Sequence, residues 1–277
     1  MAQALAKVLT YDATNVVVSQ NLLPFLWRAG HLGGRTFDVL MTRLPIGILE
    51  ERLDLVSRLH PESPTAGQFR ADDSMVEAEM EALSNARNLI TPNSEVAAFF
   101  PGRAVKLPWL MPAGYRTLSY GDQGSLRDTR QRNKGAWGAG ILFPASALAR
   151  KGAYELREAA ERLGLELVVT GPSLEGAEFW KGVKIRVAGA DPLERIGLVV
   201  LPAYIEDKPR LLLRALARGI PVIASQSCGL AGIPGVTNLP RIDRDALIEA
   251  FQCHVIGRAK YAAIKPLEST WRDWVAV

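Results

Sequence analysis

Three segments in the C-terminal half place polar residues directly after an apolar run. They are 144–151, 170–176 and 202–208, and each run is typical of a buried strand. Because the carboxyl ends of parallel strands lie along one edge of a sheet, we expect these polar residues to converge there. Lys151 and Glu206 are the pair whose chemistry stands out, since they supply an ammonium group and a carboxylate.

The cations Arg150 and Lys151 stand near the start of a helix predicted over 150–163. A helix dipole disfavours cations at this end, so a bound anion explains them better than the helix does. Phosphate is the obvious anion, held by helix amides and by the lysine charge. The readings without a ligand are an exposed lysine beside a glycine and, for Glu206, an ordinary solvated loop residue.

The stretch 198–225 is predicted to form a strand, a loop, a helix and a second strand. The apolar run 198–201 ends before Pro202; Asp207 is expected to cap the helix, with Pro209 in its first turn, and Gly219 ends it. Such a helix points free N–H groups into the crevice where open α/β sheets bind ligands.

Strand and helix patterns alternate along the rest of the chain. Strand runs lie at 15–18, 37–41, 88–91, 104–107, 140–146, 165–170 and 183–187. Helical patterns lie at 21–32, 46–59, 75–86, 94–100, 192–196 and 243–262. Ser74 and Glu77 predict a capping box before 75–86, and the polar loop 61–73 is long enough to be an insertion or a binding loop. The alternation predicts an α/β protein with parallel sheets.

The pattern divides the chain into two α/β domains. We predict an N-terminal domain over 1–111, a glycine-rich linker over 112–139 and a second domain over 140–262. The aromatic tail 263–277 is expected to dock on the first domain. Both domains are predicted to be Rossmann-like parallel-sheet domains, of which the N-terminal one is small or incomplete.

The composition and charge of the chain limit the classes of function that it can have. The chain has 277 residues, 48% of them hydrophobic and 22% charged, with a net charge of +4. No apolar run is long enough for a membrane span, and the first residues lack the apolar centre of a signal peptide, so we predict a cytoplasmic protein. The basic residues are spread out, which disfavours nucleic acid as a partner and leaves open anionic substrates or a peripheral contact at the inner face of the membrane.

The sequence lacks the motifs of several common binding and catalytic sites. The cysteines and histidines, at Cys228, Cys253, His31, His60 and His254, have no metal-binding or disulfide spacing, so no metal site is expected. The chain has no phosphate-binding G-x-x-x-x-G-K-S/T loop and no Gly-x-Ser-x-Gly elbow. A glycine-rich run at 135–140 precedes a strand, whereas a dinucleotide-binding fingerprint would follow one.

Two runs of the second domain resemble a known family. LFPASALARKGAYELREAAERLGLELVVTG and LPAYIEDKPRLLLRALARGIPVIAS are similar to the donor half of the retaining glycosyltransferases of family 4 (group 1, GT-B fold). There a Lys-Gly pair opens the first helix of the C-terminal domain, and a Pro, a Glu, a helix and a Gly-x-Pro-Val strand follow. The likeness covers 140–240. EAEMEALSNARNLITPNSEVAAFF is more loosely similar to part of the family's acceptor half.

The resemblance implies transfer of a sugar from a nucleotide-sugar donor to a glycan or lipid-linked acceptor, as in polysaccharide biosynthesis, with retention of configuration. It implies Glu206 as the catalytic residue on the donor sugar and Lys151 on the diphosphate. The further donor-binding positions it implies are Arg150, Thr170, Gly171, Pro172, Asp207, Lys208 and Arg214. No metal and no other cofactor is implied, because helix amides and basic residues would offset the charge of the leaving diphosphate.

The chain departs from the family at two positions. Arg214 stands where the family commonly has a second glutamate near the ribose, and Ser146 stands where it has an arginine. A guanidinium only donates hydrogen bonds, so it cannot replace a carboxylate that accepts from two hydroxyls. Two hypotheses follow: Arg214 reaches a phosphate, and Arg150 replaces the missing arginine.

Two other classes remain open. One is a non-catalytic homologue that binds a sugar, a nucleotide or a protein partner, which the changes at 146 and 214 and the short first domain favour. The other is a different GT-B enzyme, an epimerase or an inverting transferase, for which His60 is the histidine to consider. The donor base, the sugar, the acceptor and the oligomeric state are left open.

Overall fold

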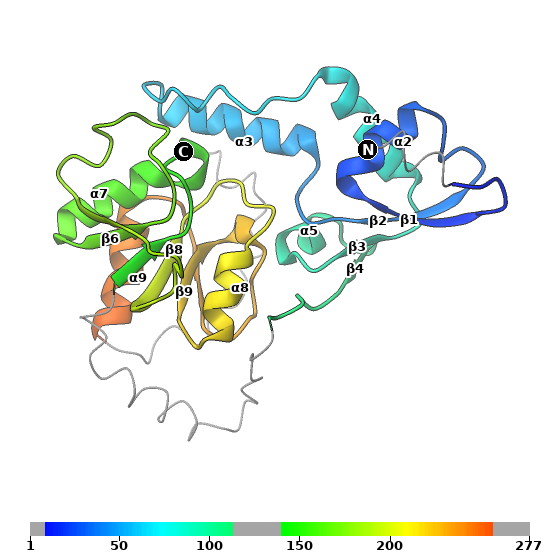
Figure 1. The fold of residues 1–277 in the computed structure, drawn as a ribbon. Coiled ribbons are helices and arrows are strands. Elements are labelled where there is room, and N and C mark those ends of the chain that lie inside the picture. The colour runs from blue at the N-terminus through cyan, green and yellow to red at the C-terminus, as the bar shows by residue number, and fades with distance from the viewer. Residues whose placement is uncertain (1–8, 113–139, 257–277) are drawn as a thin grey trace. The chain divides into compact units, whose positions relative to one another are not determined.

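The computed structural model describes residues 9–112 and 140–256. Nearly all of the predicted linker (113–139) and the whole aromatic tail (263–277) lie outside the described residues, so the docking of that tail stays a prediction. The described residues contain two parallel sheets flanked by helices (Figure 1), which confirms the predicted α/β class.

The chain forms two compact units. Among the described residues, the first unit contains 9–54 and 67–109, and the second contains 55–66, 110–112 and 140–256. The division falls inside the helix α3 (Ile46–Leu59). The last turn of this helix and the loop after it therefore pack with the C-terminal part of the chain, although the sequence pattern groups them with the N-terminal domain.

The first unit is built on a parallel sheet in the order β1-β2-β3-β4. Its strands are β1 (Asn15–Ser19), β2 (Thr36–Leu40), β3 (Leu89–Thr91) and β4 (Ala104–Lys106). Its helices besides α3 are η1 (Gln20–Leu22), α2 (Leu23–Arg28), α4 (Asp73–Asn85) and α5 (Ser94–Phe99). Leu23, Val39 and Leu89 are among the fully buried side chains of its core. The predicted strands and helices of this unit are all present, with ends shifted by a few residues.

The second unit has a six-stranded parallel sheet in the order β10-β9-β8-β5-β6-β7. Its strands are β5 (Gly140–Phe143), β6 (Glu166–Val169), β7 (Lys184–Val187), β8 (Ile196–Leu201), β9 (Val222–Ser225) and β10 (Val236–Leu239). Its helices are η2 (Ala149–Lys151), α7 (Ala153–Leu163), α8 (Arg210–Ala217), η3 (Gln226–Cys228) and α9 (Arg244–Ile256). Because β5 lies between β6 and β8, the loops that follow these strands are neighbours.

Burial explains why the apolar runs become the central strands. β8 and β9 are covered on both sides, and Val199, Val200 and Ile223 are fully buried, as expected for a parallel sheet with helices on its faces. On α8 the apolar residues recur at helical spacing, and Leu212 and Ala215 are buried. The helix therefore lies with one face on the sheet, and its start is fixed at the carboxyl end of β8.

Three predicted details are wrong in the second unit. Residues 192–196 are not a helix: backbone and side-chain bonds to Asp191 form a turn, and Arg195 has a left-handed φ of 57° before β8 begins. The strand β10 is not predicted, because its sequence, VTNL, is short and half of it is polar. The helix predicted over 150–163 is split, because Gly152 has a φ of +69° between the 3-10 turn η2 and the helix α7.

Two predicted caps are also wrong. The helix α4 begins at Asp73 after Asp72, without a side-chain cap, so Ser74 lies inside it and forms no capping box. Pro209 holds the capping position of α8, and no side chain caps that helix. Asp207 is therefore not its cap. Both errors arise because a capping signal read from sequence assumes a helix start that packing can move by one or two residues.

Gly152 offers a test of the fold. A Cβ at this position would lie 2.0 Å from the carbonyl oxygen of Pro202, whereas Gly164 at the other end of α7 has a similar φ of +62° and no atom within 4 Å of its Cβ position. We expect Gly164→Ala to cost about 1 kcal/mol of unfolding free energy and Gly152→Ala on the order of 3 kcal/mol or more. Urea unfolding of both variants measures this difference, and equal losses would contradict the close approach.

Candidate functional site

The loops after β5 and β6 are in direct contact at the carboxyl edge of the second sheet. The Ala147 amide donates to the Pro172 carbonyl at 3.2 Å, and the Leu174 amide donates back to the Ala147 carbonyl at 3.1 Å. Gly171 is so close to Ser146 that an added Cβ would lie 2.4 Å from its Oγ. The close approach gives the glycine at position 171 a packing reason. Thr170, Gly171 and Pro172 thus lie beside the turn that leads to Lys151.

The loop after β8 is held against the same turn from the other side. The amides of Tyr204 and Ile205 both donate to the Arg150 carbonyl, at 3.0 and 3.3 Å. Gly152 lets the turn η2 pass directly over Pro202, where any side chain would collide with backbone. The expected convergence of the three loops is therefore present.

The paired charges of the site are those of Lys151 and Glu206. The lysine Nζ lies 2.9 Å from Oε2 of Glu206 and donates to the Ile205 carbonyl at 2.8 Å, with side-chain exposures of 11% for the lysine and 10% for the glutamate. Two of the three N–H donors of the ammonium are thus engaged within the described residues, which leaves the third for a ligand oxygen. The other oxygen of Glu206 accepts from the Lys208 amide at 2.7 Å.

Arg150 and Asp207 lie in the same electrostatic neighbourhood. Burial lowers the pKa of the Arg150 guanidinium, while the charges of Glu206 and Asp207 act to raise it. Arg150 is therefore a partly buried cation close to the Lys151 and Glu206 pair. The Lys208 ammonium lies 3.6 Å from Asp207 and is half exposed, so its amide is the part of this residue that the site uses.

Arg214 is held elsewhere. Its guanidinium lies 3.6 Å from one carboxylate oxygen of Asp191, and the guanidinium of Arg218 donates to the other carboxylate oxygen at 2.6 Å. The charges and hydrogen bonds of these neighbours, with Arg218 first, lower the pKa of Asp191, so the carboxylate is ionised at neutral pH. The structure does not bring Arg214 together with Lys151 and Glu206.

Two carboxylates that the sequence did not single out fasten the segment Leu55–Ala66 to the rest of the second unit. Glu155 accepts from Nε2 of His60 at 2.8 Å and from the Tyr204 hydroxyl at 2.6 Å. Glu175 accepts from Ser63, Thr65, Tyr154 and the Ala149 amide. His60 also stacks on Tyr154 with ring centroids 4.2 Å apart. His60 is thus engaged in a structural contact of the second unit.

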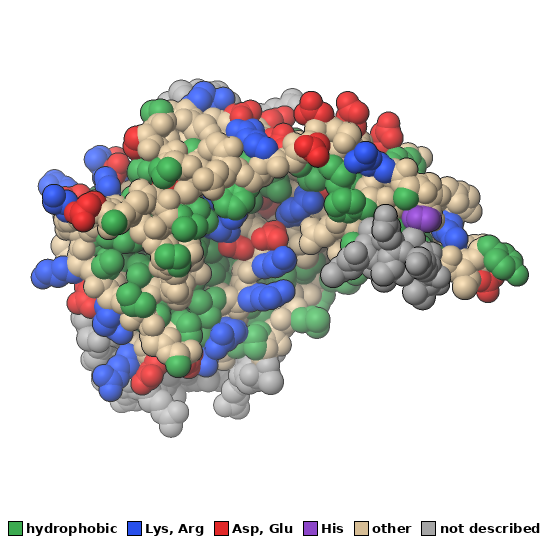
Figure 2. Space-filling view, turned by 45° about the horizontal axis from the view of Figure 1, so that its top comes forward, with side chains coloured by type: hydrophobic (Ala, Val, Ile, Leu, Met, Phe, Trp, Pro, Cys, Tyr) green, Lys and Arg blue, Asp and Glu red, His purple; other side chains and the backbone are tan. Residues whose placement is uncertain are grey.

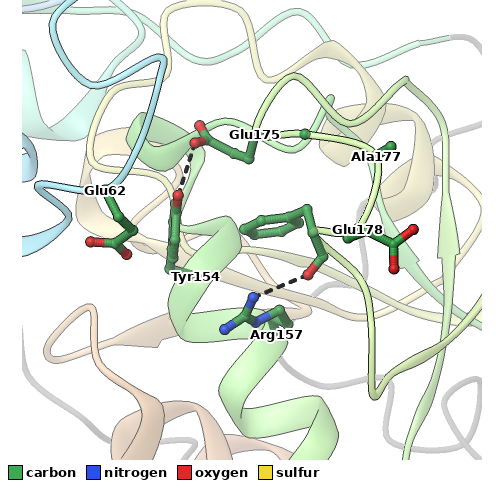
Figure 3. Close-up of a pocket in the computed structure, with 8 residues that line it drawn as sticks. Glu62, Tyr154, Arg157, Glu175, Ala177 and Glu178 are labelled. Carbon is green, nitrogen blue, oxygen red and sulfur yellow. Dashed lines mark hydrogen bonds between the residues drawn. The ribbon is translucent and has the colours of Figure 1, made fainter.

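A hollow of about 440 Å³ opens beside this contact. Figure 3 shows Tyr154 and Arg157 projecting into it from α7, with the Tyr154 hydroxyl directed at Glu175. Burial, the hydrogen bond that the hydroxyl donates to Glu175 and the charge of Glu175 raise the pKa of Tyr154 to about 12. The phenol therefore remains a hydrogen-bond donor at neutral pH. Arg157 donates to the Phe179 carbonyl at 3.1 Å.

Other classes of site find no support in the residues described. Among residues 9–112 and 140–256, no three histidine, cysteine or acidic side chains are grouped so that they could hold a metal ion. No helix in these ranges is both long and apolar enough to cross a membrane. On the face that Figure 2 displays, basic and acidic side chains are interspersed.

Comparison with solved structures defines the fold. The chain is similar to sucrose-phosphate synthase from Thermosynechococcus elongatus, with a TM-score of 0.58 and 20% identity over 91% of this chain and 67% of the other. It is similar to Anabaena HepE in complex with UDP, with a TM-score of 0.56 and 14% identity over 92% of this chain and 72% of the other. It is also similar to the lipopolysaccharide outer core galactosyltransferase WaaB in its apo form. The TM-score is 0.51, with 13% identity over 94% of this chain and 72% of the other.

These likenesses, at such low identity, establish the fold alone. The chain has the two-unit α/β architecture of the GT-B glycosyltransferases, with a four-stranded and a six-stranded parallel sheet. The fold expected from the resemblance is thereby confirmed. No family model matches the chain, and no curated protein matches it.

The His60 contact predicts a pH-dependent stability. Burial lowers the pKa of His60, but the hydrogen bond and charge of Glu155 and the charges of Glu62 and Glu158 outweigh it, so the pKa is raised. The pair therefore contributes fully below the unfolded pKa of about 6.5 and loses its contribution as pH rises through the folded pKa.

The measurement is the unfolding free energy of wild type minus that of His60→Gln, whose amide can still donate to Glu155. We expect this difference to be larger at about pH 6 than at about pH 9. A His60→Gln difference that stays constant or grows with pH would contradict the assignment.

Proposed function

We propose that the protein is a retaining glycosyltransferase that moves a sugar from a nucleotide-sugar donor to a glycan or lipid-linked acceptor. The observation that carries the proposal is the pairing of Lys151 with Glu206 at the carboxyl edge of the second sheet. Both residues stand at family positions in the motif, and both lie where α/β sheets bind ligands. The binding of UDP by the similarly folded HepE supports a nucleotide as the ligand class.

In this proposal Lys151 binds the donor diphosphate with its remaining N–H donor. Arg150 adds a second positive charge from the same turn, and the two together stabilise the negative charge that develops as the diphosphate leaves. Glu206 accepts hydrogen bonds from hydroxyls of the transferred sugar and holds its anomeric carbon in place. The reaction as proposed uses no metal ion and no further cofactor.

Retention follows from departure and attack on the same face of the sugar. The acceptor hydroxyl approaches on the side from which the diphosphate leaves, and a diphosphate oxygen takes the proton of that hydroxyl. The carboxylate of Glu206 is already engaged by Lys151 and the Lys208 amide. It is therefore suited to positioning and charge stabilisation, and a double displacement on it would require both bonds to break.

The donor site can be tested by thermal unfolding with a panel of nucleoside diphosphates and their sugars. A ligand at about a hundred times its dissociation constant stabilises the protein by about 2.7 kcal/mol, which is easily measured. We expect one base to raise the melting temperature of wild type, Lys151→Met to abolish the shift, and the exposed control Lys184→Met to keep it. A shift that survives Lys151→Met would place the nucleotide elsewhere.

A non-catalytic binding protein is the second candidate, and the ion pair of Arg214 with Asp191 favours it. The glutamate that the family places at 214 is absent, so ribose recognition is altered. If wild type binds a nucleotide sugar and neither transfers nor hydrolyses the sugar, this second candidate is the correct one.

Restoring the carboxylate at 214 tests the ribose contact. Arg214→Glu alone would set two carboxylates against each other at Asp191, so the informative variant is Arg214→Glu combined with Asp191→Asn. We expect it to bind the nucleotide sugar about tenfold more tightly, about 1.4 kcal/mol, because a carboxylate accepts from both ribose hydroxyls. Isothermal titration measures the change, with Asp191→Asn as the control. Equal affinity of the two variants would mean that position 214 does not face the ribose.

A further inference from the structure

Glu175 occupies a central place in the second unit that the proposed chemistry does not explain. It lies in the loop after β6, and its two oxygens accept hydrogen bonds from four groups. Oε1 accepts from the Thr65 hydroxyl and from the Ala149 amide, the latter at 2.7 Å. Oε2 accepts from the Ser63 hydroxyl at 2.6 Å and from the Tyr154 hydroxyl at 3.0 Å.

The Ala149 amide is the significant one of these donors. Ala149 is the first residue of η2, the turn whose last residue is Lys151, and its amide reaches Thr65 Oγ1 at 3.4 Å as well as Glu175. The other end of the turn is fixed by Gly152 against Pro202, and its middle by the Arg150 carbonyl. Glu175 therefore supplies the anchor at the start of the turn.

The remaining donors tie this anchor to a distant part of the sequence. Ser63 and Thr65 belong to the segment Leu55–Ala66, which packs in the same compact unit as Lys151. Thr65 is 4% exposed, so its hydroxyl is shielded from water and bonds instead to Glu175 and to the Ala149 amide. A carboxylate that accepts four hydrogen bonds is held firmly, because each bond to a charged acceptor is stronger than a neutral one.

We propose that Glu175, together with Thr65, is a positioning residue for Lys151 that ties the diphosphate-binding turn to the segment Leu55–Ala66. This inference rests on the proposed function for the role of Lys151, but the placement of the lysine itself is measurable without any nucleotide. Only residues 61–66 of the predicted loop 61–73 belong to this segment, and they pack in the unit that carries Lys151.

The first experiment measures how accessible Lys151 is in the ligand-free protein. Reductive methylation followed by peptide mass spectrometry gives the modification rate of Lys151 relative to the exposed Lys184 in the same sample. We expect this ratio to rise several-fold in Glu175→Gln and, to a smaller extent, in Thr65→Val. Glu178→Gln is the matched control, because it removes a carboxylate from the same hollow that makes no bond to the turn in the residues described.

The outcomes separate the inference from the proposed function. If the Lys151-to-Lys184 modification ratio in Glu175→Gln and in Thr65→Val equals that in Glu178→Gln, the positioning role is overturned. If Glu175→Gln does not fold, the ratio in Thr65→Val alone decides. A raised ratio in a protein that binds no nucleoside diphosphate supports the positioning role and overturns the sugar-transfer proposal.

The second experiment asks whether Glu175 acts through Lys151. The measurement uses a nucleoside diphosphate that wild type binds. We expect Glu175→Gln to lower the affinity for this ligand about tenfold in the wild-type background and less than twofold in a Lys151→Met background. Affinity for the nucleoside without phosphates should be unchanged by either substitution. Equal weakening in the two backgrounds would mean that Glu175 contributes only to general stability, which overturns the inference.

Discussion

The site depends on one close approach of backbone to backbone. The turn that carries Arg150 and Lys151 lies so near to Pro202 that position 152 tolerates no side chain. This contact joins the loops of two neighbouring strands, β5 and β8, and it lets the Arg150 carbonyl accept from Tyr204 and Ile205. Lys151 and Glu206 lie 55 residues apart in the chain, and this contact brings them within hydrogen-bonding distance.

Burial of the charged pair has a further consequence. A partly buried ammonium and carboxylate satisfy one another, and loss of either leaves the other charge poorly solvated. In the proposed function, a diphosphate would add an acceptor to a lysine already fixed in position, so little side-chain entropy would be lost on binding. The anchoring of the turn by Glu175 serves the same end, because a lysine is useful for phosphate only if its flexible chain is held.

The amino-acid pattern predicts the structure where local periodicity determines it, and it does not predict the contacts between residues far apart in the sequence. The apolar runs at β8 and β9 and the periodicity of α8 predict these strands and this helix. The rule that parallel strands end at one edge predicts that Lys151 and Glu206 lie near each other. Nothing local indicated that His60 would pair with Glu155, 95 residues away, or that Ser63 and Thr65 would bind Glu175. Hydroxyls and a histidine in a polar loop look solvated until the partner carboxylates are placed. The failed capping box at Ser74 has the opposite cause, a local signal overridden by packing.

The position of Arg214 limits how a nucleotide could be recognised. The helix α8 runs from the ligand edge toward the far edge of the sheet, and Arg218, just past its last turn, binds Asp191. Arg214 pairs with the same carboxylate, through its other oxygen. A donor at Lys151 and Glu206 would then be held by its diphosphate and its sugar, and its ribose hydroxyls would find no carboxylate on α8. Discrimination among nucleotides would rest on the base and on the 170–172 turn, so a site of this kind should distinguish ribose from deoxyribose poorly.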